Sequence, residues 1–218
     1  MKSYVSAVLR SFSVFGMVAM IATSQVIVAQ QDGSKPASKP APGAGPAPVV
    51  SRFSATATNL KRVNGQTITV EVTGWSPDAE REKIIALMEK GPNDVLAALR
   101  EMPSKGRIWR SGSSFGTYVR YAVRIPEPTG GERVILAVDQ DLSDWNAEFS
   151  GAATKSTSPF TVIELRITPK GTGEGKLSVG SKVAVDAANK TLALENYATA
   201  PLVLKSVKKE STVDKAAS

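Results

Sequence analysis

The chain has 218 residues, with 27 lysines and arginines against 20 acidic residues, a formal net charge of +7, and neither histidine nor cysteine. This composition excludes Ser-His-Asp and Cys-His catalysis, zinc sites built from cysteine or histidine, and disulfide bonds. Hydrolytic chemistry would have to depend on carboxylates, lysine, tyrosine or an all-oxygen metal site. The charge excess is mild and forms no dense basic stripe, so we expect no nucleic-acid partner.

The N-terminal region has the pattern of an export signal followed by a linker. Basic residues precede an almost entirely apolar run over residues 11–29, and a proline- and alanine-rich tract follows over residues 30–50. We expect a signal peptide over residues 1–29, cleaved after Ala29 or after Ser24, and hence a secreted or periplasmic protein. An uncleaved membrane anchor is the alternative, because the apolar run is near the lower length limit for a membrane helix.

The rest of the chain is predicted to form one globular domain over residues 51–210, followed by a disordered tail over residues 211–218. A domain of this length can bury a sufficient core without disulfide bonds. The tract over residues 30–50 carries prolines separated by small residues. It is therefore expected to be a disordered, extended linker.

The domain is predicted to begin with a β-hairpin. Residues 52–61 and 66–73 form two expected strands around Asn64-Gly65, a dipeptide that favours tight hairpin turns. In the second strand, apolar and polar residues alternate, as expected for a sheet with one buried face.

Two short helices are predicted next. Ser76 is expected to cap the first helix, a proline follows it at the first helical position, and Gly91 ends the helix. The second helix is expected from about Asn93 to the residue before Pro103. This pair is expected to cover one face of the sheet or to plug one open end of a barrel.

The remainder of the domain is predicted to form short strands. They cover residues 107–110, 117–125, 133–139, 160–168, 175–179, 182–186, 191–195 and 202–207. The run over residues 133–139 is almost continuously apolar and indicates a central strand. Within residues 117–125, we expect one inner face formed by Val119, Tyr121, Val123 and Ile125.

The fold class follows from this order of elements. Residues 171–175, which are rich in glycine, are expected to form a hairpin turn, because a phosphate-binding loop would need a helix after it. About nine antiparallel strands with one inserted helical hairpin predict a mainly β fold, α+β at the margin. The strands form either a barrel or a sandwich.

Four segments carry a family resemblance. They are residues 67–102, which begin TITVEVTGWSPDAEREKIIALMEK, KGRI at residues 105–108, RVILAVDQDLS at residues 133–143, and FTVIELRITPKGTGEGKLSVGSKV at residues 160–183. Together they resemble a family of uncharacterised secreted bacterial β-rich proteins with no assigned function. The resemblance spans roughly residues 53–207. It implies one exported β-rich domain and carries over no activity and no functional residues.

An acidic cluster after the strand at residues 133–139 is a candidate calcium site. Asp139, Asp141 and Asp144 lie close together in sequence, and loop carboxylates are ligands that calcium prefers. The spacing lacks the glycine and the distant glutamate of an EF-hand loop. Turn formation and the start of a helix near Asp144 would explain the same residues, so both interpretations stay open.

A group of arginines and aromatic residues is the candidate ligand-binding surface. Trp109 and Arg110 lie in one predicted strand, while Tyr118, Arg120 and Arg124 are expected on the outer face of the next. If the strands pair, rings and guanidinium groups share a surface that suits sugars or anionic polymers. An ordinary solvated sheet face is the alternative, because β-strands favour these residues anyway.

The carboxylates available for catalysis are not paired by any sequence pattern. They are Glu71, Asp139, Asp141, Glu164 and Glu195. We therefore expect a non-enzymatic extracytoplasmic binding or envelope-associated domain without a cofactor. Its partner would be an envelope polymer, a small ligand or a protein, and it would meet a membrane only through an uncleaved N-terminal segment. A carboxylate-based glycan hydrolase and a purely structural envelope component are the alternatives.

Overall fold

A computed structural model describes residues 47–59, 64–146, 158–179, 181–200 and 202–210. The predicted signal peptide, most of the predicted linker and the predicted C-terminal tail lie outside these residues. Within the described part of the chain, no helix combines the length and the apolar character needed to span a bilayer.

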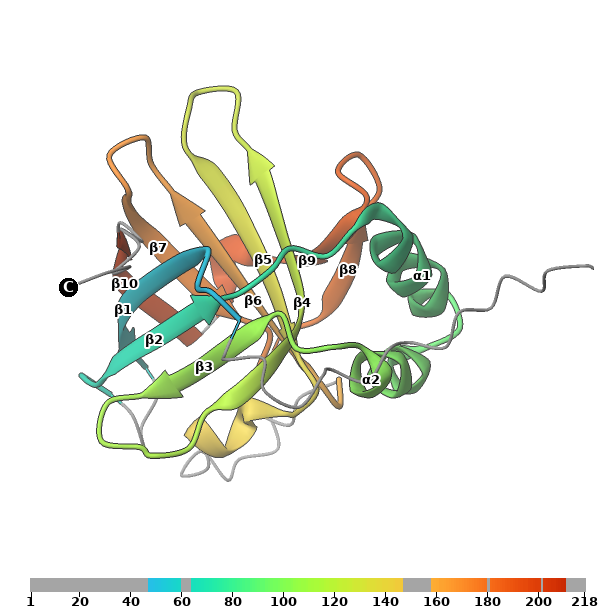
Figure 1. Ribbon diagram of the computed structural model, residues 1–218, viewed down its shortest axis with the longest axis horizontal. Coiled ribbons are helices and arrows are strands. Elements are labelled where there is room, and N and C mark those ends of the chain that lie inside the picture. The colour runs from blue at the N-terminus through green and yellow to red at the C-terminus, as the bar shows by residue number, and fades with distance from the viewer. Residues whose placement is uncertain (1–46, 60–63, 147–157, 180, 201, 211–218) are drawn as a thin grey trace, which may run out of the picture. The chain divides into compact units, whose positions relative to one another are not determined.

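The described strands form a closed antiparallel barrel and a separate two-stranded hairpin (Figure 1). The barrel strands are β1 (Ser51–Thr58), β2 (Thr67–Val72), β3 (Gly106–Arg110), β4 (Thr117–Pro126), β5 (Glu132–Val138), β6 (Thr161–Ile167), β7 (Thr172–Leu177) and β10 (Leu202–Glu210). They neighbour one another in the order β1-β10-β7-β6-β5-β4-β3-β2. The prediction of a mainly β, antiparallel fold is thus confirmed, and the fold is a barrel.

The interior of the barrel is filled by apolar side chains from alternate strand positions. The buried cluster inside it includes Phe53, Ile68, Val70, Ile108, Val119, Ala122, Leu136, Ile163, Leu165, Leu177 and Leu204. A barrel of eight strands is just wide enough for side chains to fill it. Burial of these side chains is the main source of stability, because the chain has no cysteine for disulfides.

A second apolar core lies on the outside of the barrel. It is formed between the outer face of β4–β6 and a layer made of α1 (Asp78–Met88), α2 (Pro92–Glu101), β8 (Val183–Asp186) and β9 (Thr191–Leu194). In β5, Val134 and Leu136 belong to the inner core, while Ile135 and Ala137 belong to the outer one. Burial on both faces explains why this strand is almost continuously apolar.

The prediction that Val119, Tyr121, Val123 and Ile125 share one inner face of β4 is wrong, because the strand contains an irregularity. The register of β4 against β5 shifts between Val119 and Tyr121. A bulge of this kind reverses the faces of the residues that follow it. Val119 and Ala122 therefore belong to the inner core, whereas Tyr121 and Val123 belong to the outer core. The Tyr121 hydroxyl lies 2.8 Å from the Thr191 hydroxyl.

The predicted capping hydrogen bond of Ser76 at the start of α1 is absent, and Ser76 bonds to β4 instead. Ser76 makes no capping hydrogen bond, and Pro77 occupies the cap position. The N–H of Ser76 donates to the Ala122 carbonyl at 2.7 Å, and the N–H of Ala122 donates to the Ser76 hydroxyl oxygen at 3.2 Å. Ser76 thus ties the beginning of the helical layer to β4, while the helix pair itself is confirmed.

The glycine-rich run is mostly strand, which contradicts the predicted turn over residues 171–175. Only Gly171, with φ of 74°, lies in the turn between β6 and β7. Gly173 and Gly175 lie within β7, opposite Ile167 and Leu165. A Cβ atom on Gly173 would lie 1.8 Å from the Arg166 carbonyl oxygen. Glycine is required there by a close approach of backbones.

Candidate functional site on the outer face of the barrel

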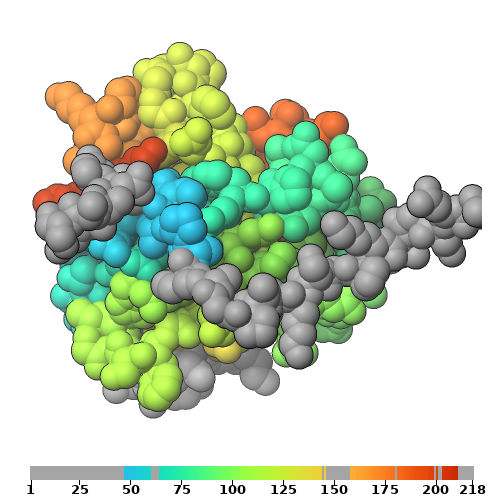
Figure 2. Space-filling view, viewed as in Figure 1, coloured from blue at the N-terminus to red at the C-terminus, as the bar shows by residue number. Residues whose placement is uncertain are grey.

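The outer positions of β1, β2, β3 and β4 bring together a group that we call the arginine–aromatic face. It consists of Arg52, Glu71, Arg107, Trp109, Tyr118 and Arg120. The register places Arg107 directly opposite Glu71 on one side and opposite Tyr118 on the other. The surface over β1, β2 and β3 faces the viewer in Figure 2. Of the two helices, α1 packs against β8 and β9, and α2 packs against β4.

Two arginines on this face stack on aromatic rings. The Arg107 guanidinium carbon lies 4.6 Å from the centre of the Trp109 ring, and that of Arg120 lies 5.2 Å from the centre of the Tyr118 ring. Tyr118 is 57% exposed, so much of this residue is open to solvent. The ring therefore offers a flat surface beside a positive charge.

Glu71 holds two of the arginines in place. Its side chain is 7% exposed, bonds to Arg52, and accepts from Nε of Arg107 at 2.9 Å. Burial would by itself raise the pKa of Glu71, but the hydrogen bonds and positive charges of the two arginines together lower the pKa. The carboxylate is therefore ionised and fixes the position of Arg107.

The lowered pKa of Glu71 predicts that this residue makes the stability of the fold decrease at acidic pH. A carboxyl group whose pKa is lowered in the folded state stabilises the fold fully when the pH is above the ordinary pKa of 4.5. This stabilisation is lost as the pH falls through the lowered pKa. We expect the urea midpoint to drop between pH 5 and pH 3, and Glu71→Gln to reduce that drop. Glu89→Gln, at an exposed position, is the control for the loss of one carboxylate. An unchanged acid dependence in Glu71→Gln would contradict the prediction.

The structure places two of the predicted binding residues elsewhere. Arg124 lies after the bulge in β4, so it does not share a face with Tyr118; it stacks at 5.7 Å on Trp75 and lies 3.6 Å from Glu132. Arg110 pairs with Ile68, a residue of the inner core, and so lies on the opposite side of β3 from Trp109.

Sequence reasoning missed Arg107, which completes the face. It lies two residues before Trp109 in the same strand. The period of two along a β-strand would have placed both side chains on one face. The same rule indicates that Arg110 belongs to the other face.

Two of the three predicted calcium residues, Asp139 and Asp141, bind protein groups. Asp139 accepts from Nε of Arg120 at 2.9 Å, and Asp141 accepts from the N–H and the hydroxyl of Ser143. These bonds at Asp141 are those of a turn, which was the alternative to a calcium site at this residue. A 3-10 helix, η1 (Leu142–Asn146), follows. The side chain of Asp144 is not among the parts of the chain that the structure describes. Among the described residues, no group of three or more acidic side chains is arranged to hold a metal ion.

A groove lies at the edge of the arginine–aromatic face. It has a volume of about 710 Å³ and is lined by Ala47, Pro48, Val49, Glu71, Thr73, Ser104, Gly106, Arg107 and Tyr118. Its walls come from the segment before β1, from β2, and from the β3–β4 pair. A groove of this size can accept a small ligand or part of a polymer.

Three of the carboxylates considered for catalysis are held by arginines. Glu71, Asp139 and Glu164 each lie 2.9 Å from an arginine nitrogen. A general acid needs a raised pKa, and the pKa of Glu71 is lowered instead. This arrangement favours a structural role for these three carboxylates.

Comparisons of the chain with protein-family models, with curated proteins and with solved structures find no match. The resemblance to secreted bacterial proteins therefore stays a prediction from the sequence.

Proposed function

We propose that this protein is a non-enzymatic binding domain that works outside the cytoplasm and holds an acidic glycan on its arginine–aromatic face. The observation that carries the proposal is the exposed Tyr118 ring beside Arg120 and Arg107, at the edge of a groove. The extracytoplasmic location is supported by the apolar N-terminal run and the small residues after it.

The chemistry of the face fits both parts of an acidic sugar. Aromatic rings stack on the apolar faces of pyranose rings, and arginine forms paired hydrogen bonds with carboxylates. Arg107 is 59% exposed although Glu71 anchors its Nε. Its remaining nitrogens can thus meet a ligand while the side chain stays ordered, which limits the entropy lost on binding.

Loss of the exposed ring is expected to weaken binding. For Tyr118→Ala we expect a dissociation constant for oligogalacturonate about tenfold higher, which corresponds to ~1.4 kcal/mol. Arg107→Ala should weaken the binding by a similar factor. Isothermal titration calorimetry measures both, and circular dichroism verifies that the variants fold. Lys208→Ala, an exposed lysine on β10, is the control for the loss of one surface side chain and should bind like the wild type.

A neutral oligosaccharide of equal length separates charge recognition from general sugar stacking. Weaker binding of malto-oligosaccharide than of oligogalacturonate supports the proposal. Equal binding of the two sugars would refute acidic-glycan recognition. Absence of binding to either sugar, or full binding by Tyr118→Ala, would refute the role of this face.

A further inference from the structure

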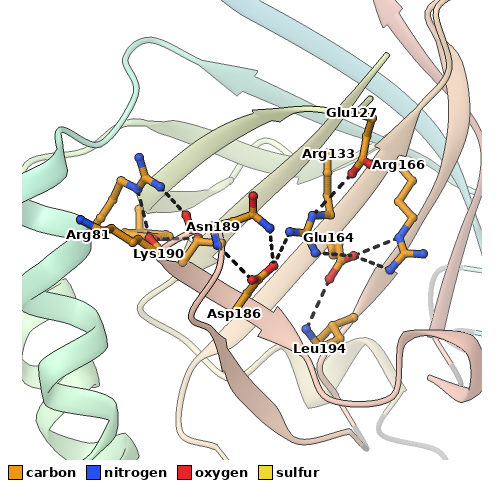
Figure 3. A network of polar contacts seen from close by, with 11 residues as sticks. Arg81, Glu127, Arg133, Glu164, Arg166, Asp186, Asn189, Lys190 and Leu194 are labelled. Carbon is orange, nitrogen blue, oxygen red and sulfur yellow. Dashed lines mark hydrogen bonds and ion pairs between the residues drawn. The ribbon is translucent and has the colours of Figure 1, made fainter. Parts of the chain in front are cut away.

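A second hollow lies at the far end of β5 and β6, between the ends of three hairpins. It has a volume of about 520 Å³. Its lining includes Glu127 from the β4–β5 connection, Arg133 from β5, Arg166 from β6, and Asp186 with Asn189 from the β8–β9 hairpin. Figure 3 shows these side chains gathered around Glu164. We call this hollow the hairpin cleft.

Arg133 is the centre of the hairpin cleft. Its side chain is 13% exposed, bonds to Asp186, and lies 4.0 Å from Glu164. The Nε atom of Arg133 is buried and has no hydrogen-bond partner among the described residues. The nearest carboxylate on that side is Glu127, whose Oε1 lies 3.8 Å away, beyond hydrogen-bond distance. A buried N–H that lacks an acceptor leaves the positive charge on this side of the guanidinium without a direct partner.

Arg166 adds a second donor that is only partly used. Its Nε and one terminal nitrogen both donate to Oε1 of Glu164, at 3.0 and 2.9 Å. Its guanidinium lies 3.6 Å from the centre of the Tyr197 ring, which fixes its plane. The side chain is 50% exposed, so its other terminal nitrogen can meet a ligand.

One carboxylate of the hairpin cleft, Glu127, is not within hydrogen-bond distance of a described basic side chain. The charged residues of its lining are Glu127, Glu132, Asp186, Arg133 and Arg166, and Glu164 lies against the two arginines. Glu164 and Asp186 are bonded to the arginines and Glu132 is bonded to Lys209, whereas Glu127 is 42% exposed and only near Arg133. The unmatched negative charge therefore lies at Glu127, where it favours a cation.

The hairpin cleft is rigidly supported. Asn189 donates from its backbone and its side chain to Asp186, at 3.1 and 2.9 Å. Arg81 of α1 donates to the carbonyl groups of Asn189 and Lys190 and thereby fixes the β8–β9 turn (Figure 3). A wall that is already ordered loses little entropy when a ligand binds.

We propose that the hairpin cleft binds a small zwitterion, an α-amino acid or the end of a short peptide. The ligand carboxylate accepts from the unused terminal nitrogen of Arg166 and lies beside the guanidinium of Arg133, and the ligand ammonium group pairs with Glu127. The two charges of such a ligand are a few ångströms apart, which matches the neighbouring positions of Arg133 and Glu127. This site is separate from the arginine–aromatic face and does not depend on the proposed glycan binding.

Four probes test the proposal: glycine, glycylglycine, acetate and ethylammonium. Titration of the isotope-labelled domain is expected to shift amide signals of residues 127–133 with glycine or glycylglycine at millimolar concentrations. The single-charge probes acetate and ethylammonium should bind at least about tenfold more weakly, because each makes only half of the contacts. Absence of shifts with both zwitterions, or equal binding of either single-charge probe, would overturn the proposal.

The matched variants locate the binding. Glu127→Gln, at an exposed position that should not disturb folding, is expected to raise the dissociation constant of the zwitterion about tenfold. Glu195→Gln, also exposed but outside the cleft lining, is expected to leave it unchanged. Unchanged binding in Glu127→Gln would overturn the assignment of the ammonium position. Tyr118→Ala should bind the zwitterion like the wild type, so failure of the glycan proposal is distinguishable from failure of this one.

Discussion

Replacement of Gly173 by alanine is expected to lower the free energy of unfolding by about 3 kcal/mol or more. Gly173 is paired on both sides, with Ile167 of β6 and Val207 of β10. A Cβ atom at this position would meet the carbonyl oxygen of Arg166 at 1.8 Å. Because the obstacle is backbone, no rotation of a side chain can relieve the collision, and β6 and β7 must separate locally. Thermal unfolding should show a midpoint lower by roughly 6–12 °C.

Gly74→Ala is the matched control for this prediction. Gly74 lies just after β2, and a Cβ atom there would meet nothing within 4 Å. Its backbone does not have a positive φ, so alanine should be neutral or slightly stabilising through the reduced freedom of the unfolded chain. A Gly173→Ala variant as stable as Gly74→Ala would contradict the close approach of β6 and β7.

Some physical signals of this fold are local to one strand, and others depend on how two strands pair. The alternation in β2 and the apolar run in β5 are properties of single strands, so the strands could be predicted from them. A bulge is set by how one strand pairs with another, and the sequence of β4 alone did not reveal it. The glycines of β7 likewise resemble a turn in composition, because only the position of the neighbouring Arg166 carbonyl shows that they are paired strand residues.

The two candidate sites also differ in how close together in sequence their residues lie. Trp109, Tyr118 and Arg120 could be identified because they lie on adjacent strands of one hairpin, and Arg107 follows from the same alternation. The hairpin cleft draws on hairpins that are distant in sequence and meet only when the barrel has closed. No spacing along the chain encodes that meeting, so the sequence could name Glu164 only as one carboxylate among several.

The register of β5 against β6 explains why a carboxylate is buried in this region. Arg133 and Arg166 are directly opposite each other on neighbouring strands. Like charges at such positions destabilise a sheet. Glu164, which is 1% exposed, neutralises this pair from the outer face of β6, and one of its oxygens also accepts from the N–H of Leu194 at 3.3 Å. The carboxylate thereby joins the barrel to the β8–β9 hairpin.

Glu164→Ala is therefore expected to lower the free energy of unfolding by about 3–5 kcal/mol. The substitution leaves the facing arginines Arg133 and Arg166 without their shared carboxylate and removes the acceptor for the Leu194 N–H. Arg166→Met should cost less, about 1 kcal/mol, because that side chain is half exposed and its loss leaves Arg133 beside Glu164. Urea unfolding at pH 7 measures both variants.

The double variant decides whether Glu164 acts through the arginine pair. If it does, Glu164→Ala with Arg166→Met should lose less stability than the sum of the single losses, because removing one arginine relieves the repulsion that Glu164 otherwise neutralises. Glu210→Ala removes a half-exposed carboxylate 3.9 Å from Arg52 and should cost under about 0.5 kcal/mol. Strict additivity in the cycle, or a loss in Glu164→Ala no larger than in Glu210→Ala, would contradict a neutralising role. A positive coupling would instead identify the buried carboxylate as the residue that allows two arginines to lie side by side in the wall of the hairpin cleft.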